Sequence, residues 1–260
     1  MTEYLFNRTI LLWAGAIAVF LLIVNPRAAL FQRVNTMNEN YVACISQDHC
    51  RDKKAITEAR EYYMVLSQLY PDYGRGFEME GVCNVLLKQD HLAIKDFEKA
   101  IKHNPNLFWA SFELGKAFYR KGEYSQAFKY FKGIISQNNN VLLNKALLPG
   151  FSKQISNKTK EGLMMSLIVF VTEIKLRSYQ MAIGSLIHQG NIAQVKDIIN
   201  SNDSNQQYDV NEFLKLVNNS IGKSDSTKAM LSWIDSLAYS DPFFHPWGHV
   251  IQPLKELLWR

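Results

Sequence analysis

The sequence has few of the features that mark the common enzyme classes or nucleic-acid binders. It contains no phosphate-binding glycine loop, no nucleophile-elbow serine and no paired-histidine metal helix. Its 29 basic and 24 acidic residues are scattered, and no run of five like charges occurs. A nucleic-acid surface needs clustered Lys and Arg to neutralise several phosphates at once. The sequence therefore favours neither catalysis nor nucleic-acid binding, and it predicts no cofactor, no metal site and no small-molecule substrate.

Cysteine is also scarce, since three cysteines are too few for a disulfide framework. Cys44 and Cys50, in the segment CISQDHC, are spaced to close one small bridge in an oxidising compartment. The alternative is that both are ordinary thiols. Cys83 is expected to be a small buried residue on a helix.

Alternating runs of β-branched residues are absent, and every periodic segment has the spacing of a helix. With 260 residues and 47% hydrophobic content, the chain is long and apolar enough to bury a core. These features predict an all-α protein.

The N-terminal apolar run, TILLWAGAIAVFLLIV from Thr9 to Val24, is the strongest local pattern in the chain. As a helix it covers about 24 Å, short of a hydrocarbon core of about 30 Å, so the span is expected to begin near Leu5. A cleaved signal peptide is the alternative. The next segment, NPRAALF, lacks small residues at both positions that cleavage requires, which favours an uncleaved single-pass transmembrane anchor.

The side of the membrane on which the soluble part lies is less clearly indicated. Arg8 precedes the apolar run 9–24, whereas Arg27 and Arg33 come after it, and a literal count of these charges puts the soluble part inside. Against this, a short N-terminal anchor commonly exports the domain attached to it, and the Cys44–Cys50 pair suits an oxidising compartment. We expect a bacterial inner-membrane protein with its soluble domain outside the cytoplasm, and the sidedness stays open.

A repeat of 34 residues defines the first half of the soluble part. Five positions recur 34 residues later, three of them with the same residue. They are Gly81, Ala93, Phe97, Ala100 and Pro105, followed by Gly115, Ala127, Phe131, Ile134 and Asn139. A small residue lets two helices approach closely, and the aromatic residue four positions later fills the gap between helix pairs. The pattern therefore predicts a repeated pair of helices.

Thirty-four residues is the period of the tetratricopeptide repeat, and this region resembles that family. The best unit begins at Phe108 and contains ELGKAFYRKGEYSQAFKYF. Its motif residues are Leu114, Gly115, Phe118, Gly122, Ala127 and Phe131, and it departs from the family at Ile134 and Asn139. The unit 74–107 is a weaker copy, with Glu80 and Asn84 where Leu and an aromatic residue are usual, and the unit 40–73 shows only its second helix. The resemblance covers about 100 of the 260 residues, and it implies an α-solenoid that binds proteins.

The remaining chain keeps its helical character while the repeat fades. The apolar segment LMMSLIVFVTEI, 163–174, is too short to span a bilayer and is expected to be a buried helix. A further helix pair is predicted around Gly190, and more helices are predicted near 210–221 and 226–239. The segment 250–260 has one apolar face and is expected to cap the stack.

These patterns divide the chain into three parts. Residues 1–33 form the membrane anchor and stalk, 34–141 the repeats, and 142–260 a divergent helical region with its cap.

The candidate partner-binding site is the concave groove that first helices line in the tetratricopeptide-repeat family. Its predicted residues are Trp109, Phe112, Lys116, Tyr119 and Arg120, continued in the preceding unit by Arg75, Glu78 and Val82. Lys116 and Arg120 share a helical face and are expected to point to solvent, where two cations flanked by aromatic rings suit an acidic or carboxylate-terminated peptide. The alternative is that the chain's own C-terminal helices cover some of these aromatic residues.

A metal site is the weaker candidate. His245 and His249 are four residues apart, but Pro246 and Gly248 between them make a helix improbable, so a turn is expected instead.

Together, the sequence predicts a membrane-anchored scaffold or adaptor that binds a partner protein and supports the assembly or stability of a membrane protein complex. Two alternatives stay open. One is a chaperone-like accessory factor for secretion or for maturation of envelope proteins, and the other is a helical enzyme or the regulatory subunit of one.

Overall fold

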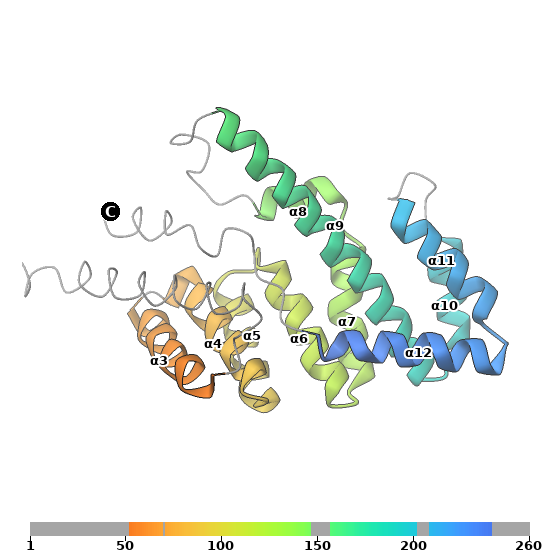
Figure 1. Cartoon of the computed structure of the whole chain (residues 1–260), viewed down its shortest axis with the longest axis horizontal. Coiled ribbons are helices and arrows are strands. Elements are labelled where there is room, and N and C mark those ends of the chain that lie inside the picture. The colour runs from red at the N-terminus through yellow and green to blue at the C-terminus, as the bar shows by residue number, and fades with distance from the viewer. Residues whose placement is uncertain (1–51, 70, 147–156, 202–207, 241–260) are drawn as a thin grey trace, which may run out of the picture. The chain divides into compact units, whose positions relative to one another are not determined.

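The computed structural model describes residues 52–69, 71–146, 157–201 and 208–240, which form helices and the short turns between them (Figure 1). The prediction of an all-α protein is confirmed for these residues. The helices are α3 (Lys53–Leu69), α4 (Arg75–Leu86), α5 (Asp90–His103), α6 (Phe108–Arg120), α7 (Tyr124–Ile135), α8 (Asn139–Ala146), α9 (Asn157–His188), α10 (Ile192–Asn200), α11 (Tyr208–Ser220) and α12 (Ser224–Ala238), with a short 3-10 helix, η1 (Pro71–Tyr73).

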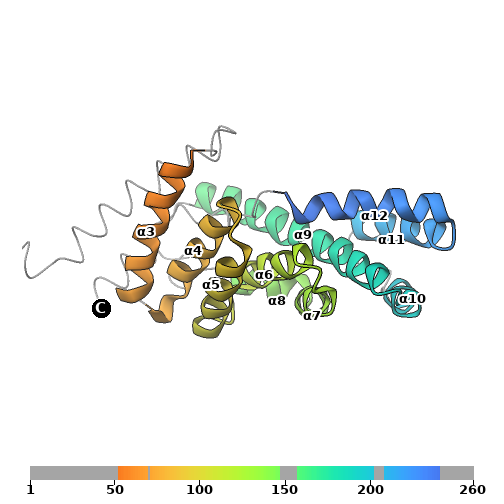
Figure 2. The ribbon, with the colours of Figure 1, turned by 90° about the horizontal axis from the view of Figure 1, so that it is seen from below.

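Helices α3 to α7 pack in chain order, each against the next, as Figures 1 and 2 show. The same crossing is made twice. Gly81 of α4 meets the ring of Phe97 on α5, and Gly115 of α6 meets the ring of Phe131 on α7; a Cβ on either glycine would lie 2.7 Å from that ring. Both rings are fully buried. The 34-residue period therefore corresponds to one close glycine–phenylalanine contact repeated in successive helix pairs.

The turns inside the two helix pairs are also equivalent. Gly122, between α6 and α7, has φ +76°, and Lys88, between α4 and α5, has φ +60°. The backbone hydrogen bonds match, because Lys88 N donates to Val85 O just as Gly122 N donates to Tyr119 O. Lysine thus occupies a left-handed conformation that costs a residue with a Cβ about 1–2 kcal/mol.

Polar contacts replace apolar ones in the weaker repeat unit. Asn84 Nδ2 of α4 donates to Asp96 Oδ2 of α5 at 2.7 Å. Glu80, also on α4, accepts a hydrogen bond from the hydroxyl of Ser67 on α3. Burial raises the pKa values of the Glu80 and Asp96 carboxyls. The helix pair keeps its geometry because each buried polar group that departs from the family pattern finds a partner.

Helix α9 is the longest described helix, with 32 residues, and it contacts the repeat helices α6 and α7 as well as α8, α10, α11 and α12 (Figure 2). The apolar segment predicted to be a buried helix lies within it, and the prediction holds for one face only. Leu167, Phe170, Val171 and Ile174 are buried, whereas Met165, Ile168 and Val169 are exposed.

A glycine allows α9 to approach its neighbours. A Cβ on Gly184 would lie 2.6 Å from Ile234 Cγ2 on α12 and 2.7 Å from the Tyr119 hydroxyl on α6. The predicted helix pair around Gly190 is confirmed as α9 and α10, and α11 and α12 occupy the positions predicted near 210–221 and 226–239.

Several predicted features lie outside the described residues. These are the apolar run 9–24, the Cys44–Cys50 pair, the His245–His249 pair, the first helix of the unit 40–73 and the C-terminal segment 250–260. Among the helices that the structure does describe, none combines the length and the apolar character needed to cross a membrane. Cys83 is fully buried, as expected.

Candidate functional site

The eight predicted groove residues lie together on two neighbouring helices. Arg75, Glu78 and Val82 are on α4, and Trp109, Phe112, Lys116, Tyr119 and Arg120 are on α6. Trp109 connects the two helices, because its indole N–H donates to Glu78 and its ring centroid lies 5.4 Å from the Arg75 guanidinium. Burial raises the pKa of the Glu78 carboxyl, and Arg75, which donates to Glu78 at 2.7 Å and 2.9 Å, opposes this. The structure therefore brings these side chains together on α4 and α6.

The expectation that Lys116 and Arg120 point to solvent is wrong. Lys116 is 0% exposed and the Arg120 side chain 7%. The physical reason is that α9 and α12 pack against α6 and fill the face that a partner peptide was expected to occupy. On α9, Phe170 lies against Trp109, with ring centroids 6.1 Å apart. Coverage by the chain's own C-terminal helices, the alternative that the sequence left open, is what the structure shows for α6.

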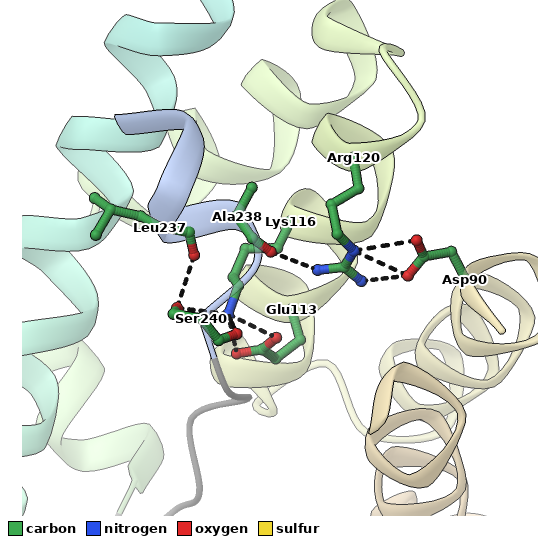
Figure 3. A network of polar contacts seen from close by, with 7 residues as sticks. All are labelled: Asp90, Glu113, Lys116, Arg120, Leu237, Ala238 and Ser240. Carbon is green, nitrogen blue, oxygen red and sulfur yellow. Dashed lines mark hydrogen bonds and ion pairs between the residues drawn. The ribbon is translucent and has the colours of Figure 1, made fainter. Parts of the chain in front are cut away.

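Lys116 binds the end of α12 (Figure 3). Its ammonium donates to the Ser240 carbonyl at 3.0 Å and to the Ser240 hydroxyl at 3.3 Å, and it forms an ion pair with Glu113 at 3.4 Å. Ser240 lies two residues beyond the last residue of α12, so Lys116 holds the segment that directly follows this helix. Burial lowers the pKa of Lys116, and the charge of Glu113 partly opposes this.

Arg120 joins the start of α5 to the end of α12. Its Nε donates to the two carboxylate oxygens of Asp90 at 2.9 Å and 3.1 Å, and its NH1 donates to the Ala238 carbonyl at 2.8 Å. Figure 3 shows both cations directed at the same end of α12. The pair therefore binds carbonyl oxygens of this chain, whereas the sequence predicted an acidic or carboxylate-terminated peptide of a partner.

A third contact holds the last turn of α12. The Tyr119 hydroxyl donates to Asp235 Oδ1 at 2.6 Å, and His188 Nε2 lies 2.8 Å from the same oxygen. The His188 ring stacks on Tyr124 with centroids 4.2 Å apart. Burial and the neighbouring Asp235 raise the pKa of the Tyr119 hydroxyl, which therefore stays a hydrogen-bond donor. Sequence reasoning missed His188 and Asp235, because no local spacing connects them to the repeat.

An open cleft of about 420 Å³ remains at one end of this face, between the ends of α4, α6 and α12 and the start of α5. Its lining includes Val85, Leu86, Lys88, Asp90, Arg120 and Tyr239. Arg120, one of the predicted groove residues, thus lines an opening large enough for a small ligand.

The comparison with protein families agrees with the repeat geometry. A tetratricopeptide-repeat family model matches residues 109–138, which contain most of α6 and all of α7. This match supports the predicted tetratricopeptide-repeat family, whose repeats generally serve as protein-interaction modules without catalytic activity. No curated protein matches the chain.

Proposed function

We propose that this chain is a scaffold that binds a partner protein and supports the assembly or stability of a membrane protein complex. The observation that carries the proposal is the glycine–phenylalanine crossing made twice, by α4 with α5 and by α6 with α7. The second crossing lies inside the segment that matches the tetratricopeptide repeat. Stacked helix pairs of this kind form extended surfaces that other proteins use for docking.

Exposed apolar side chains on the outside of the stack support a partner interaction. On α9, Met165, Ile168 and Val169 are 61%, 42% and 64% exposed and lie along one helical face over successive turns. On α12, Trp233 is 45% exposed. Apolar groups gathered on one exposed face are typical of protein-interaction sites, and tryptophan is enriched among the residues that contribute most to binding.

The membrane part of the proposal is supported by the apolar run 9–24, which has no charged residue. In this proposal the run anchors the chain in a bacterial inner membrane, and the repeat domain lies outside the cytoplasm. Protease treatment of spheroplasts tests the arrangement. Digestion of the repeat domain in intact spheroplasts is expected, and protection until the cells are lysed would place the domain on the other side.

Purification of the full-length chain from its native membranes in mild detergent tests the scaffold function. We expect one partner to co-purify at a constant ratio to the chain, and Val169→Glu to reduce that ratio by at least tenfold. Lys129→Glu, at an exposed position on α7, is the matched control and should leave the ratio unchanged. A changing set of unfolded clients would instead support the chaperone-like alternative, and the absence of any enriched protein would contradict the proposal.

A further inference from the structure

The cleft beside Arg120 has an uncommon backbone at its rim. Lys88 has φ +60° at a turn whose equivalent in the next repeat is Gly122. A lysine there is strained, whereas glycine adopts this conformation without strain because it has no Cβ. Non-glycine residues held in the left-handed region often occur at functional sites, so Lys88 is a candidate for a functional role.

The charges that line the cleft leave one cation available. Asp90 and Arg120 form an ion pair through Nε and NH2 of the guanidinium group, and its third nitrogen, NH1, donates to the Ala238 carbonyl. Lys88 is exposed and, within the described part of the chain, takes part in no ion pair. The cleft therefore offers a single uncompensated positive charge.

Apolar surface adjoins that charge. Val85 and Leu86 line the cleft from the end of α4, and Tyr239, a residue that is 72% exposed, lines it from the end of α12. An exposed aromatic ring beside a cation is suited to a ligand that has both an apolar side chain and a carboxylate. The volume of about 420 Å³ lies in the range of small-ligand pockets, roughly 300–1,000 Å³, so it accepts a short chain segment and not a folded surface.

We infer that this cleft binds an acidic peptide segment of the partner protein, with a carboxylate of the segment on Lys88 and an adjacent apolar side chain against Tyr239. The inference rests on the proposed scaffold function, which makes a peptide the expected ligand. It assigns the contact to the turn between α4 and α5 and to the end of α12, and not to the covered inner face of α6. Lys116 and Arg120 then act as positioning residues, because they hold the end of α12 in place and so build one wall of the cleft.

Fluorescence anisotropy with the full-length chain in detergent tests this inference. The probes are fluorescein-labelled hexapeptides that carry two carboxylates next to one Leu, Ile or Phe. The control peptides have Asn or Gln in place of the acids. We expect saturable binding of at least one acidic probe below about 1 mM, the weak limit of useful affinity. We expect at least tenfold weaker binding of its amide control and a marked loss of affinity in high salt.

Two substitutions separate recognition from structure. Lys88→Asn removes the charge but keeps a residue that tolerates the left-handed conformation, and it should weaken binding at least tenfold with an unchanged or higher melting temperature. Lys88→Arg should retain affinity within threefold. Equal affinity of wild type and Lys88→Asn, or no saturable binding of any acidic probe, would overturn the inference.

The same variant distinguishes failure of this inference from failure of the scaffold proposal. If a constant partner co-purifies with wild type and equally with Lys88→Asn, the scaffold function stands and the cleft is not its site. If no partner co-purifies with wild type, the scaffold function itself fails. Loss of an otherwise constant partner in Lys88→Asn, with retention in Lys129→Gln, supports both.

Discussion

The two halves of the described chain are held together in different ways. Between α4 and α7, neighbouring helices pack through glycine, alanine and phenylalanine at positions repeated every 34 residues, and the decisive contacts are local in sequence. Between α9 and α12 no such period occurs. There the end of α12 is bound to α6 through Lys116, Tyr119 and Arg120, in contacts that join residues 116 to 124 positions apart.

This difference shows that one helix can serve two kinds of packing. The face of α6 that carries Gly115 meets α7 through a close apolar contact, as the repeat requires. The face that carries Lys116 and Arg120 binds α12 through charged and polar groups. A repeat stack needs its terminal surfaces covered to stay soluble, and here the divergent C-terminal helices also cover the inner face of α6.

The largest loss of stability is expected from Lys116→Glu, which disrupts the contact between the two halves. The substitution places a second carboxylate beside Glu113 in a fully buried position and removes the donor that binds Ser240. Loss of one partner of a buried ion pair costs about 3–5 kcal/mol of unfolding free energy. Urea denaturation followed by circular dichroism measures this. A variant as stable as wild type would show that α12 does not cover Lys116 in solution.

A double variant, Glu113→Leu with Lys116→Met, controls for the buried charges. Replacement of both partners by apolar residues is expected to change stability by no more than about 1–2 kcal/mol.

The pH dependence of stability tests the same buried lysine. Burial lowers the pKa of Lys116 in the folded protein, so just below the unfolded lysine value of about 10.4 the unfolded state binds more protons. The stability of wild type relative to the double variant should therefore rise as the pH increases toward 10.

The next largest effect is expected within the repeat half, from Ala127→Trp. Ala127 is 0% exposed on α7, and an indole there separates the packed helices at a cost of roughly 3 kcal/mol. Gly122→Val should cost less, about 1–2 kcal/mol, because its Cβ would meet nothing within 4 Å and the penalty comes from φ alone. Thermal melts of the two variants compare these costs. Equal melting temperatures for Ala127→Trp and wild type would contradict the repeat register.

The repeat helices could be located from the sequence because the residues that form their contacts recur at a fixed, short spacing. Gly115 and Phe131 lie in one helix pair, and their spacing recurs in the neighbouring pair. The eight residues predicted to line a groove lie on α4 and α6, the first helices of the two pairs. The burial of Lys116 and Tyr119 was not predicted, because it depends on Ser240 and Asp235, which lie in a region without periodicity. The spacing of Lys116 and Arg120 is the same in the sequence whether their side chains contact solvent, a partner protein or another part of the chain. The sequence pattern alone therefore does not distinguish these three cases.

A smaller effect is expected from Asp235→Ala, which loosens α12 without disturbing the repeat half. Asp235 accepts from Tyr119 and contacts His188, and its side chain is 38% exposed, so the loss should be about 1–2 kcal/mol. Amide hydrogen exchange should become faster in α12 and stay unchanged in α4 and α5. Uniformly faster exchange in all helices would mean that the two halves unfold as one unit.

The smallest effects are expected from exchanging the residues at the two equivalent turns, Lys88 and Gly122, which share backbone conformation but not side chain. Gly122→Lys should destabilise the chain by about 1 kcal/mol, since the left-handed conformation costs a residue with a Cβ about 1–2 kcal/mol. Lys88→Gly relieves the same strain but removes a cation near the end of α4, which contributes about 0.3–1 kcal/mol there. A net gain of about 0.5 kcal/mol is therefore expected, and paired melts of both variants measure it. If Lys88→Gly is instead destabilising by about 1 kcal/mol or more, on the scale of the left-handed penalty itself, then lysine stabilises this turn. The strain at Lys88 would then need no functional explanation.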